Sequence, residues 1–376
     1  MKIGILTFFE STNYGTVLQA YALQKYLTDC GHETELVHIR RNIHSASGHF
    51  KTQTVSYSIL DKVMVKLRSV AAEKEEQERE RKFKAFQKEY LNVSPVFYEN
   101  DEQLERNPPQ YDLYLSGGDQ IWNPYHKVFS AHYMWDFLPE RAAIASYSSS
   151  FGVEEIDDRE IVEKMRKHLA RYRSICVRER SGVRIVESMG LQASQVLDPV
   201  FLLRGQWERF VQPSRGQKKY CLVYALIDYP KSEDKQIAAY AKAHHLEVKI
   251  IPLNRRNCLN HYFGEFDAGP IEFLNLIANA ECVFTNSFHG AAFSILFRKQ
   301  FRLLSAVSDE GKSKRDRLND LLKQFLIEDL SSGKPIDYSV VNRRLDEMLV
   351  YSEHLLNTVC EDVKQIDMGN EKQNEK

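Results

Sequence analysis

Short apolar runs alternate with helical patterns along most of this 376-residue chain, and that alternation constrains the fold more than any other feature. Strand-length apolar runs occupy 2–8 and 33–39, and a pattern with 3.6-residue spacing fills 15–31 between them. After a proline- and glycine-containing stretch at 205–219, a second series begins with the apolar run 220–225. Strands that alternate with helices form parallel sheets covered by helices. The sequence therefore predicts an α/β protein with two parallel-sheet domains that face each other across a cleft.

The expected domain boundaries follow from this alternation. We expect an N-terminal domain over 1–204, a C-terminal domain over 218–335, and a final helix with a polar tail over 336–376. The tail from 367 onward is expected to be disordered because it is almost entirely polar. A helical insertion near 57–91 becomes very charged in its second half. Its interspersed charges predict a solvated, salt-bridged helix, and a lid or partner-binding helix is the alternative.

Composition excludes several classes of protein. A formal net charge of −1 argues against wholesale binding to nucleic acid. The six cysteines are scattered without a CxxC pair, which favours buried free thiols in a reducing compartment. No stretch approaches the roughly 18 apolar residues of a membrane span, so we expect a cytoplasmic protein, with peripheral membrane contact still possible. No cluster of residues has metal-ligand spacing, and we therefore expect neither a metal nor a cofactor.

One strand-to-helix turn carries a candidate catalytic histidine. An apolar run at 282–285 breaks at a polar turn and resumes as an apolar helix from Ala291. The turn consists of Asn286, Ser287, Phe288, His289 and Gly290. In parallel sheets ligands bind where strands end and helices begin, because amide donors and the helix dipole gather there. His289 is thus a candidate for proton chemistry on an anionic substrate, and a hydrogen-bonded core histidine is the alternative.

Two loops after expected strands of the N-terminal half could contact a ligand. The first contains Asn13, Tyr14 and Gly15, and the second contains Gly117, Gly118, Asp119, Gln120 and Trp122. Paired glycines let a backbone approach a ligand closely, and hydrogen-bonding groups beside an aromatic ring are typical of sugar recognition. For the first loop the alternative is an ordinary tight turn. For the second it is a glycine-rich turn with its tryptophan in the core.

Cationic side chains follow two other expected strands. Arg178, with Arg180 close by, lies at the end of the run 174–177, where a guanidinium can bind a phosphate or carboxylate in a fork. A salt bridge to Glu179 is the alternative. A basic loop is expected at 308–317, and its cations are Lys312, Lys314, Arg315 and Arg317. These charges could bind an anionic ligand, and a solvated surface loop is the alternative. Asp198, before a proline, is expected to cap or brace backbone rather than to react.

In their order and spacing, these motifs resemble the polysaccharide pyruvyl transferase family over about residues 3–330. The residues that carry the resemblance are Asn13-Tyr14-Gly15, Ser116-Gly117-Gly118-Asp119, Val177-Arg178-Glu179, Leu197-Asp198-Pro199 and Thr285-Asn286-Ser287-Phe288-His289-Gly290. The resemblance implies a glycosyltransferase B-type fold, with two Rossmann-like domains and an active site between them. It also implies transfer of a pyruvyl group from phosphoenolpyruvate to two hydroxyls of a glycan or of a nucleotide- or lipid-linked precursor sugar. The product would be a cyclic ketal, with release of phosphate, in polysaccharide or exopolysaccharide biosynthesis.

The resemblance also assigns roles to residues. His289 and Arg178 would be catalytic, and we expect His289 to become protonated when the anionic donor binds. The donor side would include Asn286, Ser287, Phe288, Gly290, Arg180, Lys312, Lys314 and Arg315, and the acceptor side would be the two N-terminal loops described above. The chain departs from the family at Ser287, where some members carry a second donor-binding arginine. The cations of 312–317 are the expected substitute.

Two other functions fit the same sequence. A nucleotide-sugar glycosyltransferase on this scaffold would hold a diphosphate at the turn 287–290, with His289 in contact with the donor. A non-catalytic glycan-binding relative would retain the fold alone, and the serine at position 287 keeps that alternative open.

Overall fold

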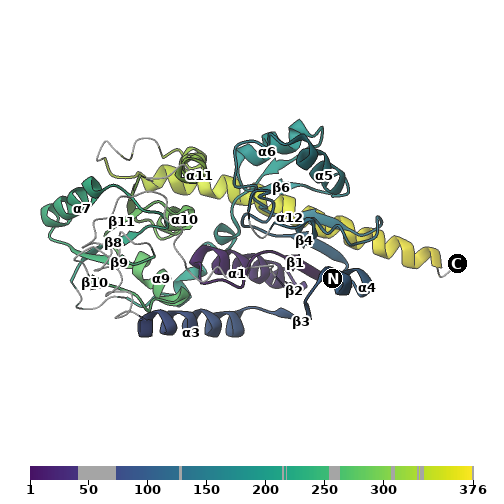
Figure 1. The fold of residues 1–376 in the computed structure, drawn as a ribbon, viewed down its shortest axis with the longest axis horizontal. Helices are drawn as coiled ribbons and strands as arrows, with labels where there is room; N and C mark the ends of the chain where they lie inside the picture. The colour runs from purple at the N-terminus through teal and green to yellow at the C-terminus, as the bar shows by residue number, and fades with distance from the viewer. Residues whose placement is uncertain are drawn as a thin grey trace.

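The computed structural model of the chain describes residues 1–40, 73–126, 129–213, 216, 218–253, 263–305, 310–327, 330 and 334–374. The first half of the predicted insertion, 57–72, lies outside these residues. Figure 1 shows two sheet-containing lobes side by side along the long axis, with the final helix running past both.

The first lobe is built on a five-stranded parallel sheet. Its strands, in spatial order, are β3 (Val93–Tyr98), β2 (Glu33–Ile39), β1 (Lys2–Leu6), β4 (Leu113–Ser116) and β5 (Ile144–Ser146). A short parallel pair, β6 (Cys176–Val177) and β7 (Ser194–Gln195), continues from β5 through isolated bridges. Because the strands are parallel, the loops that follow β1, β4 and β6 emerge at one edge of the sheet.

The second lobe repeats the same winding. Its strands, in spatial order, are β10 (Phe263–Gly264), β9 (Glu247–Ile251), β8 (Tyr220–Tyr224), β11 (Cys282–Thr285) and β12 (Gln300–Leu303), all parallel. In each sheet the first strand along the chain lies at the centre. The second and third strands are added on one side of it, and the fourth and fifth on the other. This arrangement confirms the predicted α/β class with two Rossmann-like halves.

Helices cover the sheets and connect the strands. They are α1 (Tyr14–Asp29), α3 (Glu73–Tyr90), α4 (Asp101–Arg106), α5 (Arg159–Leu169), α6 (Arg180–Ser188), α7 (Lys231–Ala243), α9 (Pro270–Ala278), α10 (Phe288–Leu296), α11 (Glu310–Gln324) and α12 (Tyr338–Asn374), with short 3₁₀ turns η1 (Ala131–Met134), η2 (Pro199–Leu203) and η3 (Trp207–Phe210). Helices α1 and α10 begin within three residues of the positions expected from the sequence, 15 and 291.

Two expectations about irregular segments were wrong. The expected basic loop at 308–317 belongs mostly to helix α11, which begins at Glu310. The polar tail is helical as far as Asn374, because α12 continues through it. The polar composition made both segments look irregular, although helix propensity is high for the Lys, Glu and Gln that they contain. The proline- and glycine-containing stretch at 205–219 includes η3, whose Trp207 and Phe210 are buried.

Helix α1 lies at the centre of the molecule. Asn13 caps its first turn, because its side-chain oxygen accepts hydrogen bonds from the amides of Gly15 and Thr16. After its last turn, Gly31 adopts a left-handed φ of 83°, which ends the helix. Twelve of its residues are buried, since the first sheet covers one side while η2 and helices of the second lobe cover others. The start of α1 is thereby held at the boundary between the lobes.

An apolar core runs without interruption from one lobe into the other. Tyr14 of α1 stacks on Phe273 of α9 with ring centroids 4.5 Å apart, and its hydroxyl donates to the Ala268 carbonyl oxygen at 2.7 Å. Helix α3 joins this boundary, because Phe83 is buried beside Tyr14 and Lys82 pairs with Asp267 at 2.7 Å. The charged helix is therefore solvated on one side only, and its other side packs on the second lobe.

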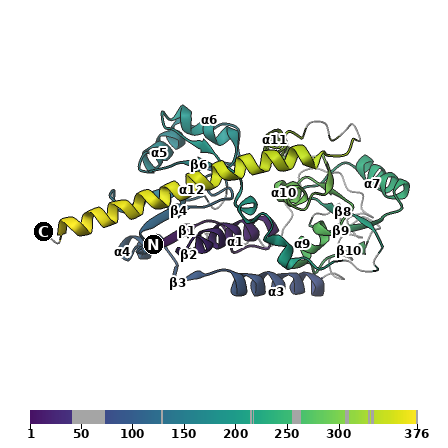
Figure 2. The same ribbon diagram turned by 180° about the vertical axis from the view of Figure 1, so that it is seen from behind.

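Helix α12 returns from the second lobe to the first. Figures 1 and 2 show it running along the length of the molecule, from near α11 to beyond the N-terminal strand. Its buried Ser352 accepts a hydrogen bond from the Leu197 amide at 3.0 Å, and Asp346 pairs with Arg204. The last helix thus braces the backbone immediately before Asp198.

We expect Ser352→Ala to lower the free energy of unfolding by about 1–3 kcal/mol, because the buried Leu197 amide loses its acceptor. Urea denaturation at pH 7 measures this change. Val350→Ala in the same helix is the control, since Val350 is 68% exposed and its truncation should alter stability by less than about 0.5 kcal/mol. Equal losses in the two variants would contradict the bracing role of Ser352.

Candidate active site

Three strand-to-helix junctions from the two lobes meet at one place. Arg178 follows β6, Asp198 precedes η2, and His289 lies in the first turn of α10. Their side chains are buried, with 3%, 1% and 8% of each residue exposed. Two of them come from the first lobe and one from the second, so the site spans the boundary between the lobes.

The carboxylate of Asp198 is the centre of this site. Its Oδ2 accepts a hydrogen bond from Arg178 Nη1 at 2.8 Å and lies 3.4 Å from His289 Nε2. Its Oδ1 accepts from the Val200 amide at 3.1 Å, which caps η2. One carboxylate therefore holds an arginine and a histidine from opposite sides of the boundary.

The local electrostatics favour the ionised forms of Asp198 and Arg178. Burial by itself would raise the pKa of Asp198, but His289 and Arg178 outweigh it and lower that pKa to about 2. Burial would likewise lower the pKa of Arg178, and the carboxylates of Asp198 and Glu179 raise it instead. The pair is therefore fully charged at neutral pH.

Glu179 anchors the loop that follows β5. Its Oε1 accepts hydrogen bonds from the Ser150 hydroxyl at 2.9 Å, the Phe151 amide at 2.8 Å and the Gly152 amide at 3.1 Å. Its Oε2 faces Arg178 Nε at 3.6 Å, an ion-pair distance without a hydrogen bond. Glu179 thus fixes both a loop and the orientation of the neighbouring guanidinium.

A second buried guanidinium enters from α11. Arg317 is 9% exposed, and its Nη1 and Nη2 lie 2.7 and 3.1 Å from the Gln120 side-chain amide, which accepts through its oxygen. Burial and the nearby charge of Arg178 lower the pKa of Arg317 to about 10, while Glu179 and Asp119 act in the opposite direction. Asp320, one turn later in α11, accepts from the Arg180 amide at 3.1 Å and so holds α11 against α6.

Three buried nitrogens of the site make no hydrogen bond to the part of the chain that the structure describes. They are Arg178 Nε, Arg317 Nε and His289 Nε2, and the first and last of them face the carboxylates of Glu179 at 3.6 Å and Asp198 at 3.4 Å. Two guanidinium groups and an imidazole that are buried together favour an anionic ligand. The guanidinium of Arg178 also lies 4.5 Å from the ring centroid of the half-buried Phe288.

The loop after β4 closes the other side of the site. Asp119 has a left-handed φ of 65°, which is uncommon for a residue with a side chain. Its Oδ2 accepts from the Thr16 hydroxyl at 2.6 Å, its Oδ1 from the Gln120 amide at 2.8 Å, and its carbonyl oxygen from the Ser150 amide at 2.9 Å. The bond to Thr16 ties the loop to the start of α1, and the bond from Ser150 ties it to the loop after β5.

Gly15 contacts the candidate histidine directly. A Cβ atom at this position would overlap His289 Nδ1, so only glycine lets the start of α1 lie against the imidazole. The next residue, Thr16, is the one that bonds to Asp119. His289 and Asp119 are therefore positioned by adjacent residues of one helix.

Several residues predicted to face an acceptor instead face the protein. Trp122 is fully buried, its indole N–H donates to the Tyr133 carbonyl oxygen, and Phe151 and Tyr172 pack against its ring, so it belongs to the core. Tyr14 is also fully buried, with its hydroxyl bonded to Ala268. The prediction that these two aromatic residues bind the acceptor was wrong, because a local pattern does not show which side of a loop meets the core.

The paired glycines were misread for a similar reason. A Cβ on Gly117 would meet Thr7, Leu23 and Ile5, and one on Gly118 would meet Gln19 and Pro199. Their close approach is thus to protein side chains rather than to a ligand. Asn13, Asp119 and Gln120 remain partly exposed, although Asn13 is engaged as the cap of α1.

The polar residues of the turn before α10 mainly build that turn. Both functional groups of Asn286 bond to the backbone of the loop after β8, at Leu226 and Ile227. Ser287 caps α10 by accepting from the Gly290 amide at 3.3 Å. These bonds contradict direct donor contacts through the side chains of Asn286 and Ser287, and they explain how His289 is held in place.

The predicted cations are distributed unevenly. The Arg180 side chain is exposed on the first turn of α6, whereas Arg178 is buried in the site. The side chains of Lys312, Lys314 and Arg315 lie outside the described residues. Sequence reasoning named Arg317 among the cations of the expected basic loop without assigning it to the site, and it named Glu179 as an alternative salt-bridge partner of Arg178, which the structure shows. It did not predict the contacts of Asp198 with Arg178 and His289. The expected cap by Asp198 is confirmed through the Val200 amide.

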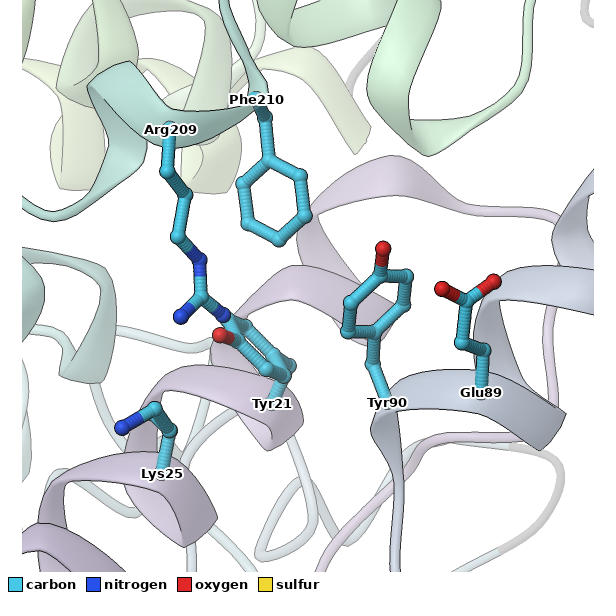
Figure 3. Close-up of a pocket in the computed structure, with 6 residues that line it drawn as sticks. All are labelled: Tyr21, Lys25, Glu89, Tyr90, Arg209 and Phe210. Atoms are coloured by element: carbon cyan, nitrogen blue, oxygen red, sulfur yellow. The ribbon is translucent and has the colours of Figure 1, made fainter.

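A separate surface depression of about 470 Å³ shares no residue with this site. Figure 3 shows its lining, which comes from α1, the end of α3 and η3. The lining residues are Tyr21, Lys25, Glu89, Tyr90, Arg209 and Phe210. The guanidinium of Arg209 lies over the rings of Tyr21 and Phe210.

Two further features are absent from the described residues. They contain no group of three or more histidine, cysteine, aspartate or glutamate side chains arranged to hold a metal ion. No helix among them is long and apolar enough to cross a membrane.

Comparison with solved structures places the fold among glycosyltransferase B-type proteins. A UDP-N-acetylglucosamine 2-epimerase from Rickettsia bellii matches with a TM-score of 0.53 and 12% identity, covering 98% of each chain. A UDP-GlcNAc 2-epimerase from Methanocaldococcus jannaschii matches with a TM-score of 0.49 and 12% identity, covering 93% of this chain and 100% of its own. The glycosyltransferase SsfS6 from Streptomyces sp. SF2575 matches with a TM-score of 0.40 and 13% identity, covering 93% and 96%. At 12% identity the likeness to the Rickettsia bellii protein shows the fold alone.

The family of the chain is identified from its sequence. The family model for polysaccharide pyruvyl transferase matches residues 13–306, a range that includes Arg178, Asp198 and His289. The chain therefore belongs to the polysaccharide pyruvyl transferase family. A search of curated proteins found no match.

We expect Gly15→Ala to displace the imidazole of His289, since the new methyl group would occupy its position. Overpacking of this kind costs about 1–3 kcal/mol of stability, which thermal denaturation detects. The histidine ring resonances in an NMR spectrum should shift as well. The control is Thr12→Ala in the exposed residue before the helix cap, and an unshifted His289 resonance in Gly15→Ala would contradict the contact.

The low pKa of Asp198 predicts an acid-sensitive contribution to stability. A folded value of about 2 against an unfolded value of 3.8 corresponds to roughly 2 kcal/mol. This contribution is present above pH 4 and is lost as the pH falls through the folded pKa, with about 1 kcal/mol gone by pH 3. Urea denaturation between pH 5 and pH 3 should therefore show a steeper loss for the wild type than for Asp198→Asn. Parallel losses would contradict the ionised pair.

Proposed function

We propose that the protein transfers a pyruvyl group from phosphoenolpyruvate to two hydroxyls of a glycan or glycan-precursor sugar, forming a cyclic ketal and releasing phosphate. The family supports the transferase class. The observation that carries the donor assignment is the burial of two guanidinium groups and an imidazole, those of Arg178, Arg317 and His289, together at the lobe boundary. Phosphoenolpyruvate carries both a phosphate and a carboxylate, which two guanidinium groups suit.

In this proposal the two arginines have complementary positions. Arg178 comes from the first lobe and is held by Asp198, whereas Arg317 comes from α11 of the second lobe and is held by Gln120. Arg317 would supply the second cation that some family members place at the position of Ser287. Both guanidinium groups would stabilise the negative charge that develops on the departing phosphate.

His289 would act as the acid. Ketal formation begins with protonation of the donor's methylene carbon C3, which leaves an electron-poor centre at C2 for attack by a sugar hydroxyl. Histidine suits this step because it exchanges a proton near neutral pH. Asp198 Oδ2 lies 3.4 Å from His289 Nε2, and the negative charges of the bound donor would lie close to the same ring.

The same proposal assigns sides to the two lobes. The C-terminal lobe, which carries His289 and Arg317, would bind the donor, and the loop after β4 in the N-terminal lobe would face a nucleotide- or lipid-linked acceptor. Free buried thiols at Cys176, Cys221, Cys282 and Cys360 agree with a reducing compartment. We infer a cytoplasmic reaction without cofactor or metal.

Orthophosphate release from phosphoenolpyruvate tests the function. The acceptors are UDP-glucose, UDP-galactose, UDP-N-acetylglucosamine and the 4-nitrophenyl glycosides of the same sugars, with products identified by the mass of an added pyruvyl group. We expect acceptor-dependent release that falls at least about 100-fold in His289→Asn, because general acid catalysis contributes about 10²–10⁴-fold. Arg178→Lys should fall similarly, since a single ammonium does not reproduce the fork.

Surface variants serve as controls for both changes. His354→Asn replaces an exposed histidine of α12, and Arg184→Gln replaces an exposed arginine that pairs with Glu154. Both should retain wild-type rates. Product formation from a nucleotide sugar without phosphoenolpyruvate would instead favour a glycosyltransferase. Sugar binding without turnover of either donor would favour a non-catalytic glycan-binding protein.

A further inference from the structure

We propose that Asp119 is the base that removes the proton from the first attacking acceptor hydroxyl, an inference that rests on the function proposed above. Asp119 lies in the loop after β4 of the first lobe, whereas His289 lies in the first turn of α10 of the second lobe. The acid and the base would then come from different lobes.

The reaction needs such a base because two hydroxyl protons must be removed. His289 gives a proton to C3, the first hydroxyl oxygen bonds to C2, and the proton of that hydroxyl passes to Asp119. The bond between C2 and the phosphate oxygen then breaks, and the phosphate leaves with the proton from Asp119. The second hydroxyl oxygen bonds to C2 and its proton returns to His289. Both side chains end the cycle in their starting state.

Elimination among the carboxylates of the site favours Asp119. Three carboxylates act on the two buried guanidinium groups, namely Asp198, Glu179 and Asp119. Asp198 is fully committed to Arg178, His289 and the Val200 amide. Glu179 is 3% exposed, and its Oε1 already accepts three hydrogen bonds. Asp119 alone of the three is partly exposed, so it can meet a hydroxyl that arrives from solvent.

The hydrogen bonds of Asp119 leave room for a further partner. An ionised carboxylate offers about four acceptor positions, and the Thr16 hydroxyl and the Gln120 amide use two of them. The two bonds also fix the direction of the side chain, as a base requires. Asp119 is therefore oriented without being saturated.

The backbone of Asp119 supports a functional role. Its left-handed φ of 65° costs energy for a residue with a Cβ, and such conformations persist where the surrounding structure imposes them. Here the Ser150 amide bonds to the Asp119 carbonyl oxygen at 2.9 Å and imposes it. A glycine would adopt this turn without strain, so the position retains a carboxylate at a conformational cost.

The start of α1 places the proposed base near the acid. Gly15 lies against His289 and Thr16 bonds to Asp119, and consecutive Cα atoms are only about 3.8 Å apart. One rigid helix end thus sets the positions of both groups, which must act on neighbouring atoms of the same adduct.

The experiment compares Asp119→Asn and Asp119→Ala with the wild type, using whichever acceptor of the panel above gives the fastest phosphate release. Asparagine keeps the shape and the bond to Thr16 but is no base. We expect kcat to fall at least about 100-fold, while the affinity for phosphoenolpyruvate, measured by titration calorimetry, changes less than about threefold. In Asp119→Ala, added sodium formate should restore activity at least tenfold, because formate can enter the vacated space and accept the proton. Asp157→Asn, a change in an exposed aspartate, is the control and should match the wild type.

The outcomes separate this inference from the function on which it rests. A wild type that consumes phosphoenolpyruvate with an acceptor, together with an Asp119→Asn variant of similar rate, would overturn the role of Asp119 and leave the function standing. An inactive Asp119→Ala variant that formate does not rescue, or that no longer binds phosphoenolpyruvate, would make Asp119 a structural residue. A wild type that never consumes phosphoenolpyruvate would overturn both.

Discussion

The arrangement of the site depends on one buried carboxylate. Asp198 is fully shielded from solvent, so its charge requires partners, and it finds them in Arg178 of its own lobe and His289 of the other. Removing either partner would leave a buried charge poorly compensated, which costs far more than an exposed pair of the same geometry. This requirement ties the orientation of the candidate acid to that of the candidate anion-binding arginine.

The surrounding apolar core keeps the two lobes in the relation that this carboxylate needs. The Tyr14–Phe273 stack, the buried face of α3 and the returning helix α12 all cross the lobe boundary. Their burial is continuous with the core of each lobe. The polar site therefore lies on an apolar core shared by both lobes. Its residues Arg178, Asp198 and His289 come from widely separated parts of the chain.

The sequence predicted the fold well because alternating strand and helix patterns have few solutions. It also predicted the turn that carries His289 and the strand end that carries Arg178, since both follow directly from local periodicity. The role of Asp198 was only half visible, because an aspartate before a proline looks like a cap, whereas its bonds to Arg178 and His289 depend on packing between lobes. Trp122 was predicted to bind a sugar because polar residues surround its aromatic ring in the sequence. The structure instead buries the ring in the core, which the local sequence does not reveal.

The contact between Gly15 and His289 has a consequence for how unwanted chemistry is avoided. The imidazole of His289 belongs to one lobe, while both the helix end against it and the carboxylate of Asp198 beside it belong to the other. Any separation of the lobes would take away this steric support and this neighbouring carboxylate at once. The proposed acid would therefore keep its geometry only while the two lobes are packed together, and a molecule with separated lobes would not hold His289 in place to protonate the donor in the presence of water.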